Sequence, residues 1–276
     1  SPAPVVVKAP ELVTTHLPRD TASLVRAGLA GGPGEEEAVA LFRALRATPE
    51  EAQAVEELVR ATQIRGLLPE RLAIARFNNF DAGTRPFTSS MTLSGITLTF
   101  QGWVDYANHI GYASVTGDPA GAQALVWNES MVAIRTAEPD ADGNPALPLE
   151  TPSEAAGWQI RGIELGASAL DSFLLFVKEL GLDRPENPLL LQQAGALWLG
   201  EEKIEIGGEK VAVTVFAAPE SEGALGPDDP QPTPEAATVK LFLDDANLIR
   251  RVEALLGAEW VTVDFGTAPG PELKLA

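Results

Sequence analysis

The sequence predicts an α+β protein in which a strongly curved antiparallel sheet forms a half-barrel, with helices on its concave side. The first observation is a hydrophobic period of two, as in residues 96–101, where Ile96, Leu98 and Phe100 alternate with polar residues. Such alternation is typical of strands with one buried face. The second is the order of elements: helices, a strand meander, a pair of helices and a second meander. Hairpin-joined strands with helices in two places favour an antiparallel sheet, and a sheet of about eight or more strands curls.

The first part of the chain is expected to hold a lead-in and two helices. Residues 1–34 are rich in proline, glycine and alanine, which predicts a flexible lead-in. Helices are expected at about residues 35–47 and 49–64, because the segment TPEE offers the second one a threonine cap, a proline and glutamates. We therefore expect one domain over residues 35–276 with these helices at its N-terminus. The alternative is two smaller domains joined near residue 145.

Residues 70–136 are expected to form an antiparallel meander that begins with a strand at ERLAIARF, residues 70–77. The polar triplet NES at 128–130 lies between two apolar runs and predicts a hairpin turn. A stretch rich in proline and acidic residues interrupts the pattern, and a strand then precedes a strongly apolar helix at residues 168–182. The segment PENPLLLQQAG predicts a further short helix, after which strands resume. The loop 219–235 between these later strands is acidic and rich in proline, so we expect it to be exposed.

Charge and composition exclude several classes of function. The chain of 276 residues carries a formal net charge of -19, so it repels a phosphate backbone, and nucleic acid is not an expected partner. It has no cysteine, which excludes disulfides and thiolate chemistry within the chain. No segment reaches the roughly 18 apolar residues of a membrane-spanning helix. Since the chain opens at Ser1 without methionine, we expect a signal peptide or anchor upstream and an extracytoplasmic location in the cell envelope.

We identify no catalytic, cofactor-binding or metal-binding residues in the sequence. The only histidines are His16 and His109, and neither falls where a buried general base is expected. The segment DADGNPALPLE has the spacing of a calcium loop, but Pro145 stands where that loop needs glycine, so we interpret it as a turn. No pair among the 39 acidic residues is singled out for acid–base chemistry. The protein is therefore not expected to be an enzyme.

The helix at residues 168–182, SALDSFLLFVKELGL, is more apolar than a surface helix needs to be. Six of its side chains fall within an arc of roughly 160°, wider than the arc of about 100° that packs a helix on a core. They are Leu170, Phe173, Leu174, Phe176, Val177 and Leu180. Leaving them in water would cost on the order of 10 kcal/mol, comparable with the stability of a domain. They must be covered by the protein's own sheet or, in part, by a bound apolar molecule.

A curled sheet has inward side chains that two short helices could leave partly uncovered. If the alternation is right, the inward strand residues include Leu98, Phe100, Val213, Val215, Leu241 and Leu243. Together with the six helix residues, they are our candidate lining of an apolar cavity. Long acyl chains suit such a cavity, because it needs apolar area and few hydrogen bonds.

Several stretches of the chain resemble a known family. They are RFNNFDAGTRPFTSSMTLSGITLTFQGWVDYANHIGYASVTG, ALVWNESMVAIR, a GW strand, the apolar helix with its extension to ALWL, and VKLFLDDANLIRRVEALL with WVTVDFG. In order and spacing, over about residues 50–266, they are similar to uncharacterised actinobacterial envelope proteins and, through them, to the LppX and LprG lipoproteins with their LolA-like half-barrel. The resemblance implies a curved antiparallel sheet around helices, lipid or lipoglycan binding, lipid transport between membrane and outer envelope, and no catalytic residues. Unlike those lipoproteins, the chain has a longer N-terminal region, and it shows no lipobox cysteine, a residue that would lie upstream of Ser1.

Two functions are compatible with these features. The first is an extracytoplasmic carrier that binds a lipid or lipoglycan and holds its acyl chains in an apolar cavity between the curved sheet and the helices. The alternative is a non-catalytic module for envelope-stress sensing or partner binding, similar to RseB, in which a LolA-like fold binds a partner protein. In that case the acidic loop 219–235 and the N-terminal helices would contact an envelope protein.

Overall fold

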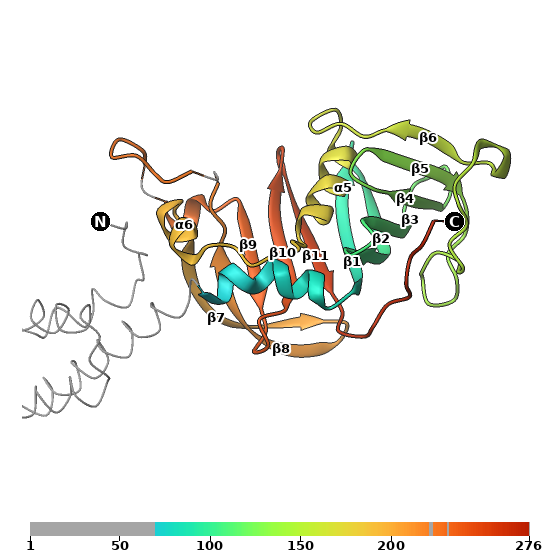
Figure 1. Cartoon of the computed structure of the whole chain (residues 1–276). Coiled ribbons are helices and arrows are strands. Elements are labelled where there is room, and N and C mark those ends of the chain that lie inside the picture. Colours follow the sequence, from blue (N-terminus) through green and yellow to red (C-terminus); the bar gives the residue numbers. More distant parts are fainter. Residues whose placement is uncertain (1–69, 221–222, 231, 276) are drawn as a thin grey trace, which may run out of the picture.

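The structure is a computed structural model that describes residues 70–220, 223–230 and 232–275 (Figure 1). Its first described element is a helix that runs through residues 70–81. The elements that follow, in chain order, are β1 (Thr84–Leu93), β2 (Ile96–Asp105), β3 (Ile110–Thr116), β4 (Gln123–Trp127), β5 (Met131–Thr136), the 3-10 turn η1 (Glu154–Ala156), β6 (Gln159–Gly162), α5 (Ala169–Glu179), α6 (Pro188–Gln193), β7 (Leu197–Ile206), β8 (Glu209–Ala217), η2 (Pro234–Ala236), β9 (Val239–Leu243), β10 (Ile249–Leu256) and β11 (Glu259–Phe265).

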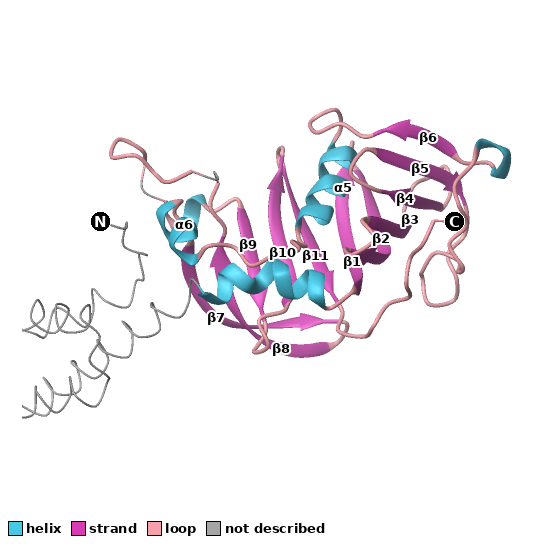
Figure 2. Ribbon diagram, viewed as in Figure 1, coloured by secondary structure: helices cyan, strands magenta, loops and turns pink. Residues whose placement is uncertain are grey.

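The strands of the described part form one 11-stranded sheet with the order β6-β5-β4-β3-β2-β1-β11-β10-β9-β8-β7. All neighbours in it are antiparallel, and β1 pairs with β11 in the middle of the sheet. β6 and β7 form the two edges and are joined through α5 and α6. The sheet curves strongly, and the helices lie on its concave side (Figures 1 and 2). The expected α+β half-barrel is confirmed.

The helix α5 fills the centre of the concave side. Its cap is Ser168, whose hydroxyl accepts a hydrogen bond of 3.0 Å from the backbone N–H three residues further on. Phe173, Leu174 and Val177 are completely buried, and their neighbours come from both halves of the sheet. The ring of Phe173 lies 4.7 Å from the ring of Phe100 on β2, measured between centroids. Much of the apolar excess of this helix therefore packs against the protein's own sheet.

The outer face of β2–β5 is covered by irregular segments of the same chain. The stretch 137–158 and the C-terminal tail 266–275 both contribute side chains to it. The buried residues on this face are Trp103, Ile110, Tyr112, Ala124, Val126, Ala133, Trp158 and Leu273. Within the stretch, the carboxylate of Asp140 accepts hydrogen bonds of 2.9 Å from the backbone N–H groups of Asp142 and Asn144. This segment is a turn, as we interpreted it.

The hairpin β7–β8 folds back beneath its neighbouring strands (Figure 1). As a result, two of the candidate lining residues, Val213 and Val215, lie outside the main core. Nη2 of Arg251 on β10 donates a hydrogen bond of 3.0 Å to the carbonyl oxygen of Glu205 near the end of β7. Val213 and Val215 lie in a cluster separate from the main core, whereas the adjacent Phe216 is in the main core. The other members of this cluster are Ile204, Val211 and Phe242. The expectation that both valines point inward was wrong, because alternation shows that the valine face of β8 is buried but not on which side of the sheet it lies.

The expected strand at residues 70–77 is also wrong, because residues 70–81 are helical. Leu72, Ala75 and Asn79 are buried, at the three- and four-residue spacing of a helix. The short run looked like a strand because Leu72 and Ile74 alternate with smaller or polar residues. Alanine and arginine, which make up much of the rest, are strong helix formers, and a short apolar run does not distinguish the two structures.

The expectations for residues 1–34, 35–47 and 49–64 lie outside the described residues. The extent of a single domain over residues 35–276 stays a prediction. In the described part, β5 and β6, which lie on either side of residue 145, pair with each other in the same sheet. The hairpin turn at NES is present, since the side chain of Asn128 accepts hydrogen bonds from the backbone N–H groups of Ser130 and Met131.

We expect Leu174→Asp to lower the free energy of unfolding by about 3 kcal/mol or more, because a charge would enter an apolar core without a partner. Leu174 is 0% exposed and packs between α5 and the sheet. Urea denaturation followed by tryptophan fluorescence measures the change. Leu165→Asp is the matched control, since Leu165 is 79% exposed, and it should shift stability by no more than ~0.5 kcal/mol. Equal stability of the Leu174 variant and the wild type would contradict the placement of α5.

Candidate functional site

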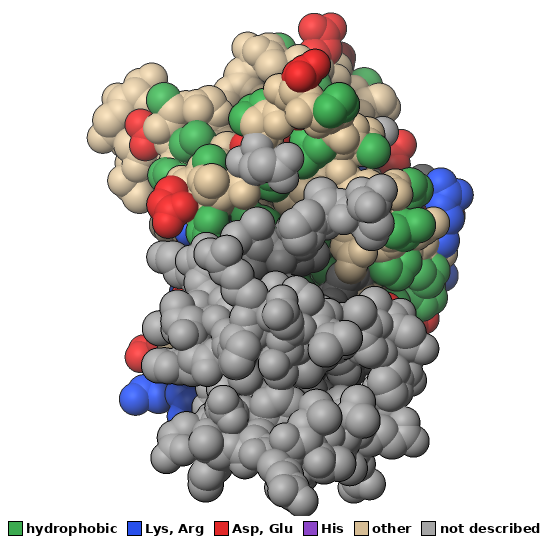
Figure 3. All heavy atoms as spheres, turned by 90° about the vertical axis from the view of Figure 1, so that its left-hand side faces the viewer, with side chains coloured by type: hydrophobic (Ala, Val, Ile, Leu, Met, Phe, Trp, Pro, Cys, Tyr) green, Lys and Arg blue, Asp and Glu red, His purple; other side chains and the backbone are tan. Residues whose placement is uncertain are grey.

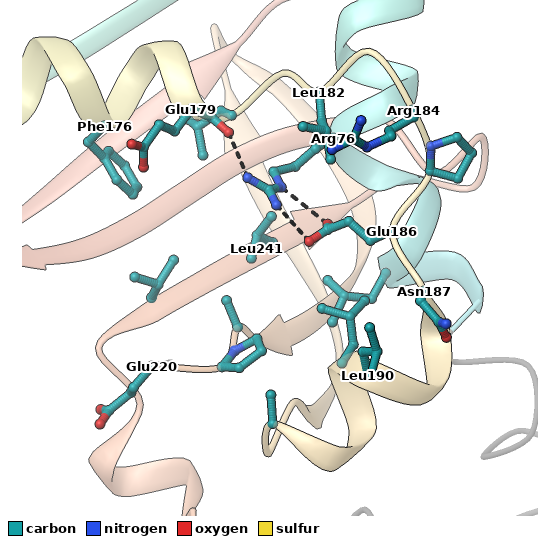
Figure 4. A pocket seen from close by; sticks show the side chains of 18 residues that line it. Arg76, Phe176, Glu179, Leu182, Arg184, Glu186, Asn187, Leu190, Glu220 and Leu241 are labelled. Carbon is teal, nitrogen blue, oxygen red and sulfur yellow. Dashed lines mark hydrogen bonds and ion pairs between the residues drawn. The ribbon is translucent and has the colours of Figure 1, made fainter. Parts of the chain in front are cut away.

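A half-open pocket of about 750 Å³ lies beside α5, between the helix of residues 70–81, α6 and the start of β9 (Figure 4). Its apolar lining consists of Leu72, Phe176, Leu180, Leu182, Pro185, Leu190, Leu191, Ala194, Ala218, Pro219, Val239 and Leu241. Its polar lining consists of Arg76, Glu179, Arg184, Glu186, Asn187 and Glu220. The pocket is therefore mainly apolar, with charges of both signs among its lining residues.

The structure divides the twelve predicted lining residues into three groups. Phe176, Leu180 and Leu241 line the pocket. Val213 and Val215 lie in the separate cluster of the β7–β8 hairpin. The other seven are in the main core or pack against it without lining the pocket: Leu98, Phe100, Leu170, Phe173, Leu174, Val177 and Leu243. These seven residues therefore contribute to the packed main core, and the pocket lies to one side of α5.

Sequence reasoning missed the contributions of α6 and of the helix of residues 70–81. Leu190 and Leu191 come from α6, and Leu72 comes from the helix that we had expected to be a strand. A signal for α6 was present in the three consecutive leucines of PLLLQQ. In a helix, successive residues lie about 100° apart, so three consecutive leucines cannot all face one core.

Side chains from the sheet and from the helix of residues 70–81 hold the C-terminal end of α5 in place. The phenol of Tyr106 donates a hydrogen bond of 2.9 Å to the carbonyl oxygen of Val177, and burial raises the pKa of this phenol. The indole of Trp127 donates one of 3.1 Å to Leu174, and the amide of Asn79 donates one of 2.8 Å to the carbonyl oxygen of Leu180. The last carbonyl groups of a helix have no partners within the helix. The bonds from Tyr106 and Asn79 satisfy such groups at Val177 and Leu180, and the bond from Trp127 adds a further donor to the carbonyl of Leu174, about one turn earlier. Together they fix the position of the wall that carries Phe176.

Gly181, just after α5, allows the chain to pass close to the ring of Tyr106. A Cβ atom at Gly181 would come 2.3 Å from the ring of Tyr106, which no real contact permits. Any larger residue would displace either this ring or the segment that leads from α5 into the pocket wall. The absence of a side chain at Gly181 therefore helps to set the shape of the pocket.

Arg76 joins three elements at the edge of the pocket. Its guanidinium forms a bidentate ion pair with the carboxylate of Glu186, with distances of 3.1 Å from Nε and 2.6 Å from Nη2. Nη1 donates a hydrogen bond of 3.1 Å to the carbonyl oxygen of Glu179 at the end of α5 (Figure 4). Backbone bonds support the same attachment, from Leu182 N–H to the Arg76 carbonyl and from Glu186 N–H to the Ala73 carbonyl. The segment between α5 and α6 is thus fastened to the helix of residues 70–81.

The acidic loop 219–235 borders the pocket in its described part. Pro219 and Glu220 line the pocket, and the backbone N–H of Leu225 donates a hydrogen bond of 2.8 Å to the carbonyl oxygen of Gln193 at the end of α6. The role of this loop in binding a partner protein stays a prediction.

Lys178 on α5 is 7% exposed and does not line the pocket. Burial lowers the pKa of its ammonium group to about 8, although the charges of Glu129 and Asp105 act in the opposite direction. The protonated form of this lysine therefore destabilises the fold at neutral pH.

Among residues 70–220, 223–230 and 232–275, no group of three or more histidine, cysteine, aspartate and glutamate side chains could hold a metal ion. Within the same ranges, none of the helices has the length and apolar character needed to cross a membrane.

The fold and the pocket define a class of protein: an antiparallel half-barrel with an apolar pocket beside its central helix. In a comparison with solved structures, the chain is similar to the lipoprotein LppX of Mycobacterium tuberculosis, with 9% sequence identity and a TM-score of 0.37, over 75% of this chain and 96% of LppX. It is also similar to an outer membrane lipoprotein-sorting protein domain from Vibrio parahaemolyticus, with 10% identity and a TM-score of 0.22, over 73% of this chain and 89% of that domain. No protein-family model and no curated protein matches the chain.

We expect Lys178→Met to stabilise the protein by about 1–3 kcal/mol at pH 7, because each unit of pKa shift corresponds to about 1.4 kcal/mol. Below pH 8 the folded state bears the full cost of the buried charge. As the pH rises from about 8 towards the ordinary value of 10.5, the unfolded state binds more protons than the folded state, so wild-type stability rises relative to the variant and the gain disappears.

Urea denaturation of both proteins at several pH values measures this difference in stability. A range of roughly pH 6 to 11 covers the folded and the unfolded pKa of Lys178. Lys274→Met is the control, because the side chain of Lys274 is 67% exposed, and it should show no comparable gain. A Lys178 variant whose advantage does not change with pH would rule out a buried, depressed lysine.

Proposed function

We propose that the protein is a non-catalytic, extracytoplasmic lipid-binding carrier of the cell envelope that holds acyl chains in the pocket beside α5. The observation that carries this proposal is the pocket itself, whose floor and walls are mainly leucine, phenylalanine, valine and alanine side chains. Apolar pockets of several hundred Å³ with few polar groups are typical ligand sites.

The size of the pocket suits one or two acyl chains. A water molecule occupies about 30 Å³ in the liquid, and a methylene group is of similar size, so 750 Å³ has room for roughly 25 such groups. Removing one methylene group from water contributes about 0.8 kcal/mol. Ten enclosed methylenes would contribute roughly 8 kcal/mol before the cost of association, enough for useful affinity.

The lining also indicates how a lipid would lie. Phe176, Leu241 and Val239 form an apolar surface, whereas Arg76, Glu186 and other charged groups are also present. A charged group buried against acyl chains would be costly, so the acyl chains would lie along the apolar surface and the polar head would remain near the charges or in water.

Binding fits this site better than catalysis. The lining residues include no histidine, serine, threonine or lysine among those described. The guanidinium of Arg76 forms an ion pair with Glu186. This pair holds two segments together and does not activate a nucleophile. We propose no cofactor, and we propose a lipid or another apolar small molecule as the ligand.

We expect Ala218→Trp to weaken binding of a dansyl-labelled fatty acid by about tenfold or more, which corresponds to 1.4 kcal/mol. Ala218 is half-buried and lines the pocket, so the indole would occupy space needed by the acyl chain. Fluorescence titration measures the affinity, and thermal unfolding checks that the variant is folded.

Ala141→Trp is the matched control, since Ala141 is exposed in the turn at residues 140–144 and lies outside the pocket. It should bind the probe as the wild type does. A folded Ala218→Trp variant with unchanged affinity, or a wild-type protein that does not bind the probe, would refute the proposal.

A further inference from the structure

The short helix α6 has an apolar face turned to solvent. Leu189 is 49% exposed and Leu190 is 54% exposed, while Leu191 packs against the main core. Figure 3 views the molecule from the side of α6 and shows hydrophobic side chains on the described part of this face. Exposing about half of each of two adjacent leucine side chains to water costs free energy. Exposed apolar groups that gather at one place commonly mark a binding surface.

This face is continuous with the pocket. Leu190 is both exposed and part of the pocket lining, and Leu191 and Ala194 continue the lining inward from α6 (Figure 4). Leu189 is exposed without lining the pocket. An apolar molecule that reached α6 could therefore pass into the pocket along leucine side chains, without full exposure to water.

The segment of α6 carries no charge of its own, and the described part of the acidic loop 219–235 lies beside it, with the Leu225 N–H bonded to the Gln193 carbonyl. From Asn187 to Gly200 the sequence NPLLLQQAGALWLG has no acidic or basic residue, in a chain whose formal net charge is -19. The preceding Glu186 is neutralised by its ion pair with Arg76. An anionic membrane surface attracts basic segments and repels a strongly acidic protein. An uncharged bilayer surface does neither, and leucine side chains enter such an interface readily.

We propose that α6 docks on a bilayer of zwitterionic lipids, with Leu189 and Leu190 at the interface, and that the acyl chain moves from the bilayer into the pocket past Leu190. This inference rests on the proposed function, since it assigns the place where the ligand is taken up. The contact is small, which fits a carrier that must leave the membrane after loading.

Leu189→Gln tests docking separately from binding, because Leu189 does not line the pocket. Transfer of a dansyl-labelled fatty acid from phosphatidylcholine vesicles to the full-length protein is followed by stopped-flow fluorescence. We expect the variant to take up the probe roughly three- to tenfold more slowly, the effect of removing one half-exposed leucine from the interface. Its affinity for the free probe should equal that of the wild type.

Leu147→Gln is the matched control. Leu147 is also 49% exposed but lies in the stretch 137–158 that covers the outer face of the sheet, so its transfer rate should be unchanged. With the wild type, the transfer rate should rise with vesicle concentration, as expected for collision, and fall when anionic lipid is added to the vesicles.

Each remaining outcome has a distinct meaning. Failure of the wild type to bind free probe would refute the proposed function and this inference together. Normal binding with a transfer rate that is independent of vesicle concentration, or a Leu189→Gln variant as fast as the wild type, would overturn the docking site alone. Faster transfer from anionic vesicles would contradict the charge argument. Self-association of the wild type that Leu189→Gln abolishes in sedimentation velocity would assign this face to a second copy of the chain instead.

Discussion

The attachment of the C-terminal end of α5 is the constraint on which the rest of the structure depends. A helix end buried in a core would leave carbonyl groups without partners, at a cost of about 1–3 kcal/mol each. Here Tyr106 in the turn after β2, Trp127 on β4, and Asn79 and Arg76 on the helix of residues 70–81 donate to carbonyl oxygens of α5 and of the residue that follows it. The central helix therefore has one position on the sheet.

That position decides where empty space remains. With α5 fixed over the middle strands, Phe173, Leu174 and Val177 are buried in the main core of the half-barrel. Phe176 and Leu180 face the side where α6 and β9 diverge from α5, and there the pocket forms. The unusually wide apolar arc of this helix thus has two uses: one part packs against the sheet, and the other lines a space that the chain's own described side chains do not fill.

The division into two meanders with a helix pair between them, the NES hairpin and the start of α5 at Ser168 could be predicted from local pattern, because each depends on residues close together in sequence. The strand β1 was missed, and with it the seam of the sheet. The helix at residues 70–81 could not be predicted, since its apolar run is short enough to fit either period. The inward face of β8 could not either, because Val215 and Phe216 are both buried and face different clusters. The pocket depends on distant partners such as Arg76 and Glu186, and no local pattern reveals which residues meet there.

The pairing of β1 with β11 has a consequence for the assembly of the molecule. Phe87, near the start of the described chain, pairs with Phe265, near its end. All other strand pairs join strands that are neighbours in sequence, so each half of the sheet can form by successive hairpins. The seam between the halves closes only when the last strand is in place. Until then β1 has an open edge able to pair with other chains, and such long-range closure is slow. Release of a chain cut short before β11 would thus leave the β1–β6 half and the shortened β7–β10 half with no seam between them.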